Sequence, residues 1–160
     1  MLALNEVFCA ERDVSSASRY CVIKDGVDQG VFKSSGLIVS TGTGSTGWLH
    51  AARQLTVQQL EDVQKLIGSL GVDSETNDKL AEELSNETNF PRDDPRMYFY
   101  VREGFSLTRA SEGFCKNMKI TSEMLNGKVV IDAWYHRDLS IGDKFTLTSS
   151  KDYMLRCMQL

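Results

Sequence analysis

The sequence predicts an α+β fold that is rich in β-strands and carries a helical segment between its early and late strands. The first and last thirds of the chain consist of short β-favouring runs separated by turn signals, whereas the middle third has the apolar spacing of amphipathic helices. A chain of 160 residues is long enough for one domain with a sizeable core. We therefore expect a single domain over residues 1–160, with the helical insertion at about 46–89.

In the first third, β-favouring runs predict strands over residues 2–8, 20–24, 31–33 and 36–40. Asp25-Gly26, which closes the second run, is a hairpin turn signal. The spacing of the turns favours an antiparallel meander.

In the middle third, apolar residues recur every three or four positions, which predicts an amphipathic helix. They are Val57, Leu60, Val63, Leu66, Ile67 and Leu70. Asp73 or Ser74 can cap a second helix that runs toward Asn86. Pro91 and Pro95 then bracket an acidic loop and end the helical section.

The last third predicts strands over residues 97–102, 114–120, 128–135, 144–148 and 153–157. Asn126-Gly127 is a strong signal for a two-residue hairpin, and Gly142-Asp143 indicates a second turn.

Composition limits the classes of protein to which the chain can belong. Hydrophobic residues make up 41% and charged residues 25%, which excludes a disordered or collagen-like chain. The net charge of −4 argues against nucleic acid as a main partner, because a duplex-binding surface needs a basic excess. No apolar run approaches the ~20 residues that cross a bilayer, so we expect no membrane partner. No targeting signal is visible at the N-terminus.

Cysteine and histidine spacing argues against a metal site. Cys9, Cys21, Cys115 and Cys157 are scattered among apolar residues, and no C-x-x-C pair or neighbouring histidine supplies zinc-ligand spacing. We expect four buried free thiols in a reducing compartment.

The most informative segment covers residues 36–48 and reads GLIVSTGTGSTGW. It predicts a strand, a loop of small residues and a helix start. Small side chains let a ligand approach the backbone, and hydroxyls with free N–H groups suit a phosphate or a ribose. A glycine-rich turn with Ser/Thr capping explains the composition equally well.

Gly42, Gly44 and Gly47 match G-x-G-x-x-G, but the dinucleotide fingerprint also needs a second parallel strand after the helix. More helix follows here, so that interpretation fails. The phosphate loop of P-loop enzymes fails as well, because Trp48 stands where lysine is required.

Asn5-Glu6 lies in an otherwise apolar stretch, where an amide and a carboxylate are costly to bury unless something polar satisfies them. An Asn side chain can bind an adenine edge, and a Glu can accept two hydroxyls of one ribose. An edge strand with one face in water would explain the pair without a ligand.

Together, Asn5-Glu6 and the Thr-Gly-Thr-Gly-Ser-Thr-Gly-Trp loop resemble the NAD kinase family, in which an Asn-Glu strand motif precedes a loop reading Thr-Pro-Thr-Gly-Ser-Thr-Ala-Tyr. The resemblance covers nearly the whole chain. It implies the two-sheet, mostly antiparallel C-terminal domain of that family, which binds NAD. The segments 33–36, 41–45 and 101–103 are most similar to its divergent mitochondrial branch, and this branch implies a mitochondrial location.

The resemblance implies roles for individual residues. Asn5 and Glu6 would contact the adenosine part of NAD, and Trp48 would take the place of the family's stacking tyrosine. Ser35 stands where many members have an aspartate that reaches the nicotinamide-riboside end. The residues lining the dinucleotide would be Thr43, Thr46, Gly47 and Trp48.

The family's phosphoryl-transfer motif, Gly-Gly-Asp-Gly, is absent from this sequence. The resemblance therefore implies the substrate-binding part of an enzyme that transfers the terminal phosphate of ATP to the 2′-hydroxyl of NAD, with Mg²⁺ expected to assist. No catalytic residue and no metal ligand is expected in this chain, which we expect to be inactive or weakly active alone. As a second possibility, it is a non-catalytic module that pairs with a full-length subunit, and a homodimer is expected. A relative of lipid kinases is a weaker third possibility.

Overall fold

The computed structural model describes residues 1–66, 74–86, 89–105, 110–150 and 152. Within these ranges the strands form two antiparallel sheets, with orders β6-β5-β4-β1-β8-β9 and β10-β7-β2-β3. The strands are β1 (Glu6–Glu11), β2 (Ser18–Lys24), β3 (Val27–Ser34), β4 (Gly36–Ser40), β5 (Met97–Arg102), β6 (Glu112–Cys115), β7 (Asn117–Ser122), β8 (Gly127–Ile131), β9 (Tyr135–Leu139) and β10 (Lys144–Thr148). Helices separate β4 from β5, so the predicted α+β class is confirmed.

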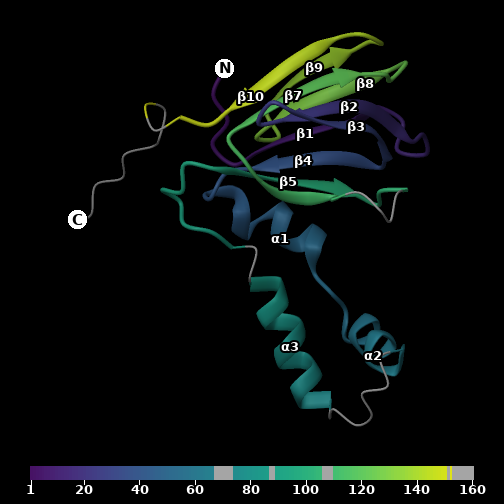
Figure 1. The fold of residues 1–160 in the computed structure, drawn as a ribbon, viewed down its shortest axis with the longest axis vertical. Coiled ribbons are helices and arrows are strands. Elements are labelled where there is room, and N and C mark those ends of the chain that lie inside the picture. The colour runs from purple at the N-terminus through teal and green to yellow at the C-terminus, as the bar shows by residue number, and fades with distance from the viewer. Residues whose placement is uncertain (67–73, 87–88, 106–109, 151, 153–160) are drawn as a thin grey trace.

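The two sheets pack face to face (Figure 1). Apolar side chains from both sheets form the main core. From β4, Leu37 and Val39 face this core, which also contains Tyr20 and Ile120 of the opposite sheet. Ile38, between them, belongs to a second cluster on the other face of the same sheet. Because both faces of β4 are covered, all five of its residues are buried, which accounts for its uninterrupted apolar run.

The second cluster holds helix α1 (Trp48–Arg53) against the larger sheet. Leu49 is fully buried there with Ile38, Phe90 and Tyr98. The turn η1 (Gly44–Thr46) connects β4 to α1. This packing fixes the position of the Gly-Thr loop between the strand and the helix.

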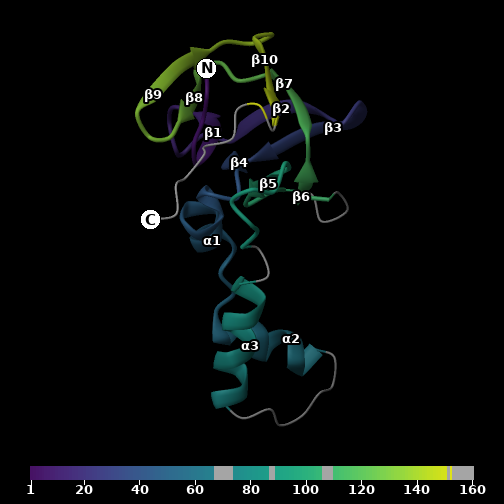
Figure 2. The ribbon, with the colours of Figure 1, turned by 90° about the vertical axis from the view of Figure 1, so that its left-hand side faces the viewer.

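Helices α2 (Val57–Leu66) and α3 (Ser74–Asn86) project away from the sheets, as Figures 1 and 2 show from two directions. The Gln64 amide donates a hydrogen bond of 2.8 Å to Asn77, which is buried. The predicted apolar stripe of α2 contains no fully buried residue, and Leu66 is 87% exposed. Its predicted continuation over 67–73 lies outside the described residues. No helix in the described ranges is long and apolar enough to span a membrane.

The meander expected for the first third is wrong, because consecutive strands are divided between the two sheets. β1 pairs with β4 and β8, whereas β2 pairs with β3 and β7. The predicted hairpin turn between β2 and β3 is confirmed, with φ of 48° at Asp25 and 84° at Gly26. These left-handed values are typical of the tight turns that match strand twist.

Two predicted late strands are each a pair of strands. Residues 114–120 contain a break between β6 and β7, which belong to different sheets. Residues 128–135 are interrupted by a turn with φ of 48° at Asp132 and 60° at Ala133, which the sequence does not announce with glycine. The hairpin predicted at Asn126-Gly127 is wrong, since β7 and β8 lie in different sheets. The turn at Gly142 is confirmed, and the strand predicted over 153–157 lies outside the described residues.

Three of the four cysteines lie in the described ranges, and all three are free thiols. Cys9 and Cys115 are buried as predicted, and burial raises the pKa of each to about 12. Cys21 is only half-buried and donates a hydrogen bond to Glu123, so its expected burial is wrong. Cys157 lies outside the described residues.

Candidate functional site

The loop that follows β4 is tied directly to the start of β1. The backbone N–H of Thr41 donates a hydrogen bond of 2.9 Å to the carbonyl oxygen of Asn5, and the Thr41 hydroxyl donates one of 2.6 Å to the carbonyl oxygen of Leu4. The register of the two strands places Glu6 opposite Ser40. The structure therefore brings together the Asn5-Glu6 motif and the Gly-Thr loop.

Gly44 lies against the peptide of Asn5. A Cβ atom at this position would lie 2.4 Å from the carbonyl oxygen of Asn5 and 2.8 Å from the hydroxyl of Ser40. Real Cβ atoms do not approach backbone that closely. The loop therefore needs glycine here in order to pack on the Asn5 peptide.

The side chains of Asn5 and Glu6 make no hydrogen bond within the part of the chain that the structure describes, although both are half-buried. Burial raises the pKa of the Glu6 carboxyl above its ordinary value of 4.5, and the nearby Asp132 carboxylate raises it further. Half-buried polar groups of this kind are costly unless water or a ligand satisfies them. Their donors and acceptors are available to a bound molecule.

The other loop residues differ in exposure. Thr43 is half-buried, whereas Thr46 and Gly47 are exposed. Gly47 is the residue before α1, and no side chain caps that helix. The predicted helix start is confirmed, but α1 has only 6 residues, so its contribution to binding a phosphate is small.

Trp48 and Ser35 belong to a second group of residues, near the other end of β4. The indole of Trp48 packs on Phe8 with ring centroids 4.6 Å apart, and the Arg102 guanidinium lies 5.8 Å from the indole centroid. Arg102 is 3.7 Å from the Glu103 carboxylate, which accepts a hydrogen bond from the Ser35 hydroxyl. The structure therefore links Ser35 to Trp48 through two charged residues and separates Ser35 from Asn5 by the length of β4.

The first group of residues consists of Asn5, Glu6 and the Gly-Thr loop. A cavity of about 810 Å³ opens beside this loop. Thr41, Thr43 and Asp132 line it together with the N-terminal residues 1–4 and parts of the segments 92–97 and 146–150. Its walls are mixed, since apolar side chains from both sheets alternate with hydroxyls and charged groups. Of the predicted binding residues, only Thr43 is among those that line this cavity.

Ser45 connects the Gly-Thr loop to the segment that leads into β5. Its hydroxyl donates a hydrogen bond of 2.8 Å to the carbonyl oxygen of Gly42 and accepts one of 3.3 Å from the N–H of Phe90. A Cβ atom at Gly42 would lie 2.0 Å from the carbonyl oxygen of Pro91. The Gly-Thr loop is thus held by the segment of Phe90 and Pro91 as well as by the peptide of Asn5.

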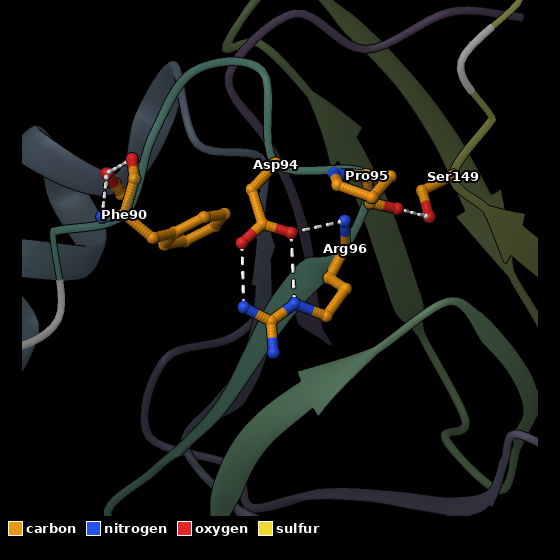
Figure 3. Close-up of polar contacts among 6 residues, drawn as sticks. Phe90, Asp94, Pro95, Arg96 and Ser149 are labelled. Carbon is orange, nitrogen blue, oxygen red and sulfur yellow. Dashed lines mark hydrogen bonds and ion pairs between the residues drawn. The ribbon is translucent and has the colours of Figure 1, made fainter.

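The acidic loop between the prolines is held by its own ion pair (Figure 3). Arg96 approaches the Asp94 carboxylate with both Nη2 and Nε, at 2.7 and 3.0 Å, and this hydrogen bonding lowers the pKa of Asp94. The Ser149 hydroxyl donates a hydrogen bond of 2.5 Å to the carbonyl oxygen of Pro95, which joins the loop to the residue after β10. Asp94 is therefore paired with a cation.

Among the described residues, no group of three or more His, Cys, Asp or Glu side chains could hold a metal ion. The carboxylates nearest the loop, Glu6 and Asp132, are two ligands at most. These residues do not fit a dedicated Mg²⁺ site.

Comparison with solved structures identifies the class of fold. A yeast NADH kinase complexed with NADH matches with a TM-score of 0.63 and 16% identity, covering 94% of this chain and 35% of that chain. An NAD kinase from Archaeoglobus fulgidus in complex with ATP matches with a TM-score of 0.59 and 18% identity, covering 93% and 46%. The fold is that of the C-terminal domain of NAD kinases.

Sequence comparison shows which NAD kinases this chain resembles. Human "NAD kinase 2, mitochondrial" is 30% identical over 168 residues, covering 99% of this chain and 38% of that protein. Its Xenopus tropicalis counterpart is 26% identical over 155 residues, covering 81% and 36%. No family model matches the sequence. The resemblance to the NAD kinase family and to its mitochondrial branch is confirmed, and the chain spans less than two-fifths of the length of these relatives.

Sequence reasoning missed two features of the site. Asp132 contacts the Asn5-Glu6 segment from the β8–β9 turn, and Glu103 contacts Ser35 from the end of β5. Asp132 interrupts an apolar run, which is the one available signal, whereas no pattern pairs Glu103 with Ser35.

Proposed function

We propose that this chain is the NAD-binding domain of an NAD kinase whose complete form transfers the terminal phosphate of ATP to the 2′-hydroxyl of NAD. One observation carries the proposal. The Thr41 and Gly44 contacts with the Asn5 peptide place the Gly-Thr loop beside two polar side chains that no described residue satisfies. The mitochondrial names of the relatives support a mitochondrial location.

In this proposal the first group of residues binds the adenosine part of NAD. The Asn5 amide pairs with the adenine edge, and the Glu6 carboxylate accepts the hydroxyls of the ribose. Thr43, Thr46 and Gly47 line the dinucleotide from the loop. Their small or hydroxylated side chains leave room for the sugar and phosphates.

The second group of residues binds the nicotinamide-riboside end. Trp48 offers an aromatic face for stacking, and the Ser35 hydroxyl takes the position of the family's aspartate. The separation of the two groups along β4 suits an elongated ligand with a ring at each end.

The complete enzyme takes ATP, with Mg²⁺ neutralising its phosphates, and these interactions require the Gly-Gly-Asp-Gly motif that this sequence lacks. We therefore expect little or no NADP formation when the purified chain is incubated with ATP, Mg²⁺ and NAD. Coupled spectrophotometric detection of NADP measures it. Turnover like that of a complete kinase would show that this chain carries its own phosphoryl-transfer centre.

Replacing Glu6 by glutamine tests the binding site. Because a hydrogen bond to a charged group contributes about 1.5–3 kcal/mol, Glu6→Gln is expected to weaken NAD binding at least about tenfold. Calorimetry with NAD measures this, and Asn5→Ala and Thr46→Val should also reduce the heat. A wild-type chain that releases no heat with NAD would contradict the proposed function.

Glu6→Gln is expected to stabilise the folded chain, although it weakens NAD binding. The raised pKa of Glu6 means that ionisation costs the folded state, so Glu6→Gln is expected to melt at a higher temperature than wild type at pH 7. Well below pH 4.5 the carboxyl is protonated in both the folded and the unfolded state, and the difference in melting temperature should vanish. Thermal melts at several pH values decide this, and a lower melting temperature at pH 7 would count against the burial of Glu6.

A second candidate function is a module that pairs with another subunit, and a homodimer is its simplest form. The projecting hairpin of α2 and α3 favours it, because Val63 and Leu66 expose apolar surface there. Light scattering decides the oligomeric state. A dimer that binds no NAD would favour this second function.

A further inference from the structure

We propose that Asp132 is the positioning residue of the proposed NAD site, because its carboxylate holds three consecutive backbone amides and so fixes the Asn5-Glu6 motif. The inference rests on the function proposed above. Nothing in the sequence motifs assigns a role to this residue, which lies in the turn between β8 and β9.

The contacts are specific for the two carboxylate oxygens. Oδ2 of Asp132 accepts a hydrogen bond of 2.6 Å from the N–H of Leu4, and Oδ1 accepts bonds of 2.7 Å from Asn5 and 3.0 Å from Glu6. The N–H of Asp132 in turn donates a hydrogen bond of 3.0 Å to the carbonyl oxygen of Glu6. Hydrogen bonds to an ionised carboxylate are among the strong ones in proteins.

The hydrogen bonds to Asp132 continue the pairing of β1 beyond the end of its ladder with β8. The last ladder pair of β1 and β8 joins Val7 to Ile131, so the residues before it have no ladder partner on that side. Asp132 supplies that partner. On the other side, the Asn5 carbonyl accepts the N–H of Thr41. The peptide units of Asn5 are therefore held from both neighbouring strands, which limits the directions its amide side chain can take.

The backbone of the turn is strained in a way that suits this role. Asp132 and Ala133 have φ of 48° and 60°, and the N–H of Trp134 closes the turn on the carbonyl of Ile131 at 3.1 Å. Asparagine, aspartate and glycine are preferred in such a turn, so Asp132 suits its position. Ala133 carries the cost of a left-handed backbone without the glycine that the second position prefers.

Two substitutions distinguish the effect of the Asp132 carboxylate from the effect of the turn conformation. Asp132→Gly keeps the left-handed backbone but removes the acceptor, whereas Ala133→Gly keeps the acceptor and relaxes the turn. We expect amide exchange at Leu4, Asn5 and Glu6 to accelerate about tenfold or more in Asp132→Gly, and NAD affinity to fall at least about tenfold. Ala133→Gly should leave both unchanged. NMR exchange rates and calorimetry measure them.

A third variant tests the effect of the Asp132 charge on Glu6. Asp132→Asn removes the charge that faces Glu6, so the pKa of Glu6 falls and NAD binding should persist to lower pH than in wild type. An unchanged profile would show that the carboxylate of Asp132 does not face Glu6, and the positioning role would then be wrong.

The outcomes separate the two proposals. If wild type binds NAD and Asp132→Gly binds it equally well, the positioning role is wrong while the proposed function stands. Unchanged exchange at the three amides would also overturn it. If wild type binds no NAD, the proposed function fails, and with it the purpose assigned to Asp132.

Discussion

Gly44→Ala is expected to abolish measurable NAD binding and to lower the free energy of unfolding by about 1–3 kcal/mol. The added Cβ would meet the carbonyl oxygen of Asn5 at 2.4 Å, and this neighbour is backbone that cannot turn aside as a side chain does. The loop must therefore move away from β1. Such a movement separates the hydroxyls of the loop from the side chains of Asn5 and Glu6.

Urea denaturation and calorimetry with NAD measure the two effects. Ala51→Ser is a suitable control, because it also adds one heavy atom but on the exposed side of α1, where changes are usually within about 0.5 kcal/mol. An alanine at position 44 that leaves both stability and affinity at wild-type values would mean that the loop does not rest on the Asn5 peptide.

Leu49→Ala is expected to cost about 2–5 kcal/mol of unfolding free energy, the range measured for large apolar residues in well-packed cores. Leu49 is fully buried between α1 and the larger sheet, where it contacts the cluster of Ile38, Phe90 and Tyr98. Its loss leaves a cavity beneath the helix that carries Trp48. NAD affinity should therefore fall together with stability.

Leu55→Ala provides the matched comparison, since Leu55 follows α1 and is 40% exposed. It should cost less than about 1 kcal/mol. Equal losses in the two variants would show that α1 is not anchored by Leu49, and the role given to the second cluster would then be wrong.

Patterns of neighbouring residues in the sequence predicted individual strands and helices. The bounds of β4, β5 and β10 follow from β-favouring runs with clear turn signals, and α3 begins at Ser74, where the cap was predicted at Asp73 or Ser74. The division of strands between sheets was not predictable in this way. It depends on contacts between distant residues, and the Asp132-Ala133 turn lacks the glycine that announces such a break.

Only part of the candidate site could be predicted from the sequence. The pairing of Asn5-Glu6 with the Gly-Thr loop was predicted from a resemblance between motifs, and the structure places them in contact. The link from Ser35 through Glu103 and Arg102 to Trp48 was not predicted, because it joins side chains whose spacing in sequence carries no period. The role of each residue in binding stays a prediction.

The Asp132 contacts also bear on the order in which the molecule is completed during synthesis. The carboxylate lies 126 residues beyond the N–H of Glu6, so the Asn5-Glu6 segment cannot gain these hydrogen bonds until the β8–β9 turn has been synthesised. Contacts of such long range are slow to close. A nascent chain that stops short of the β8–β9 turn would therefore present the Asn5-Glu6 segment without the acceptor for its three backbone amides.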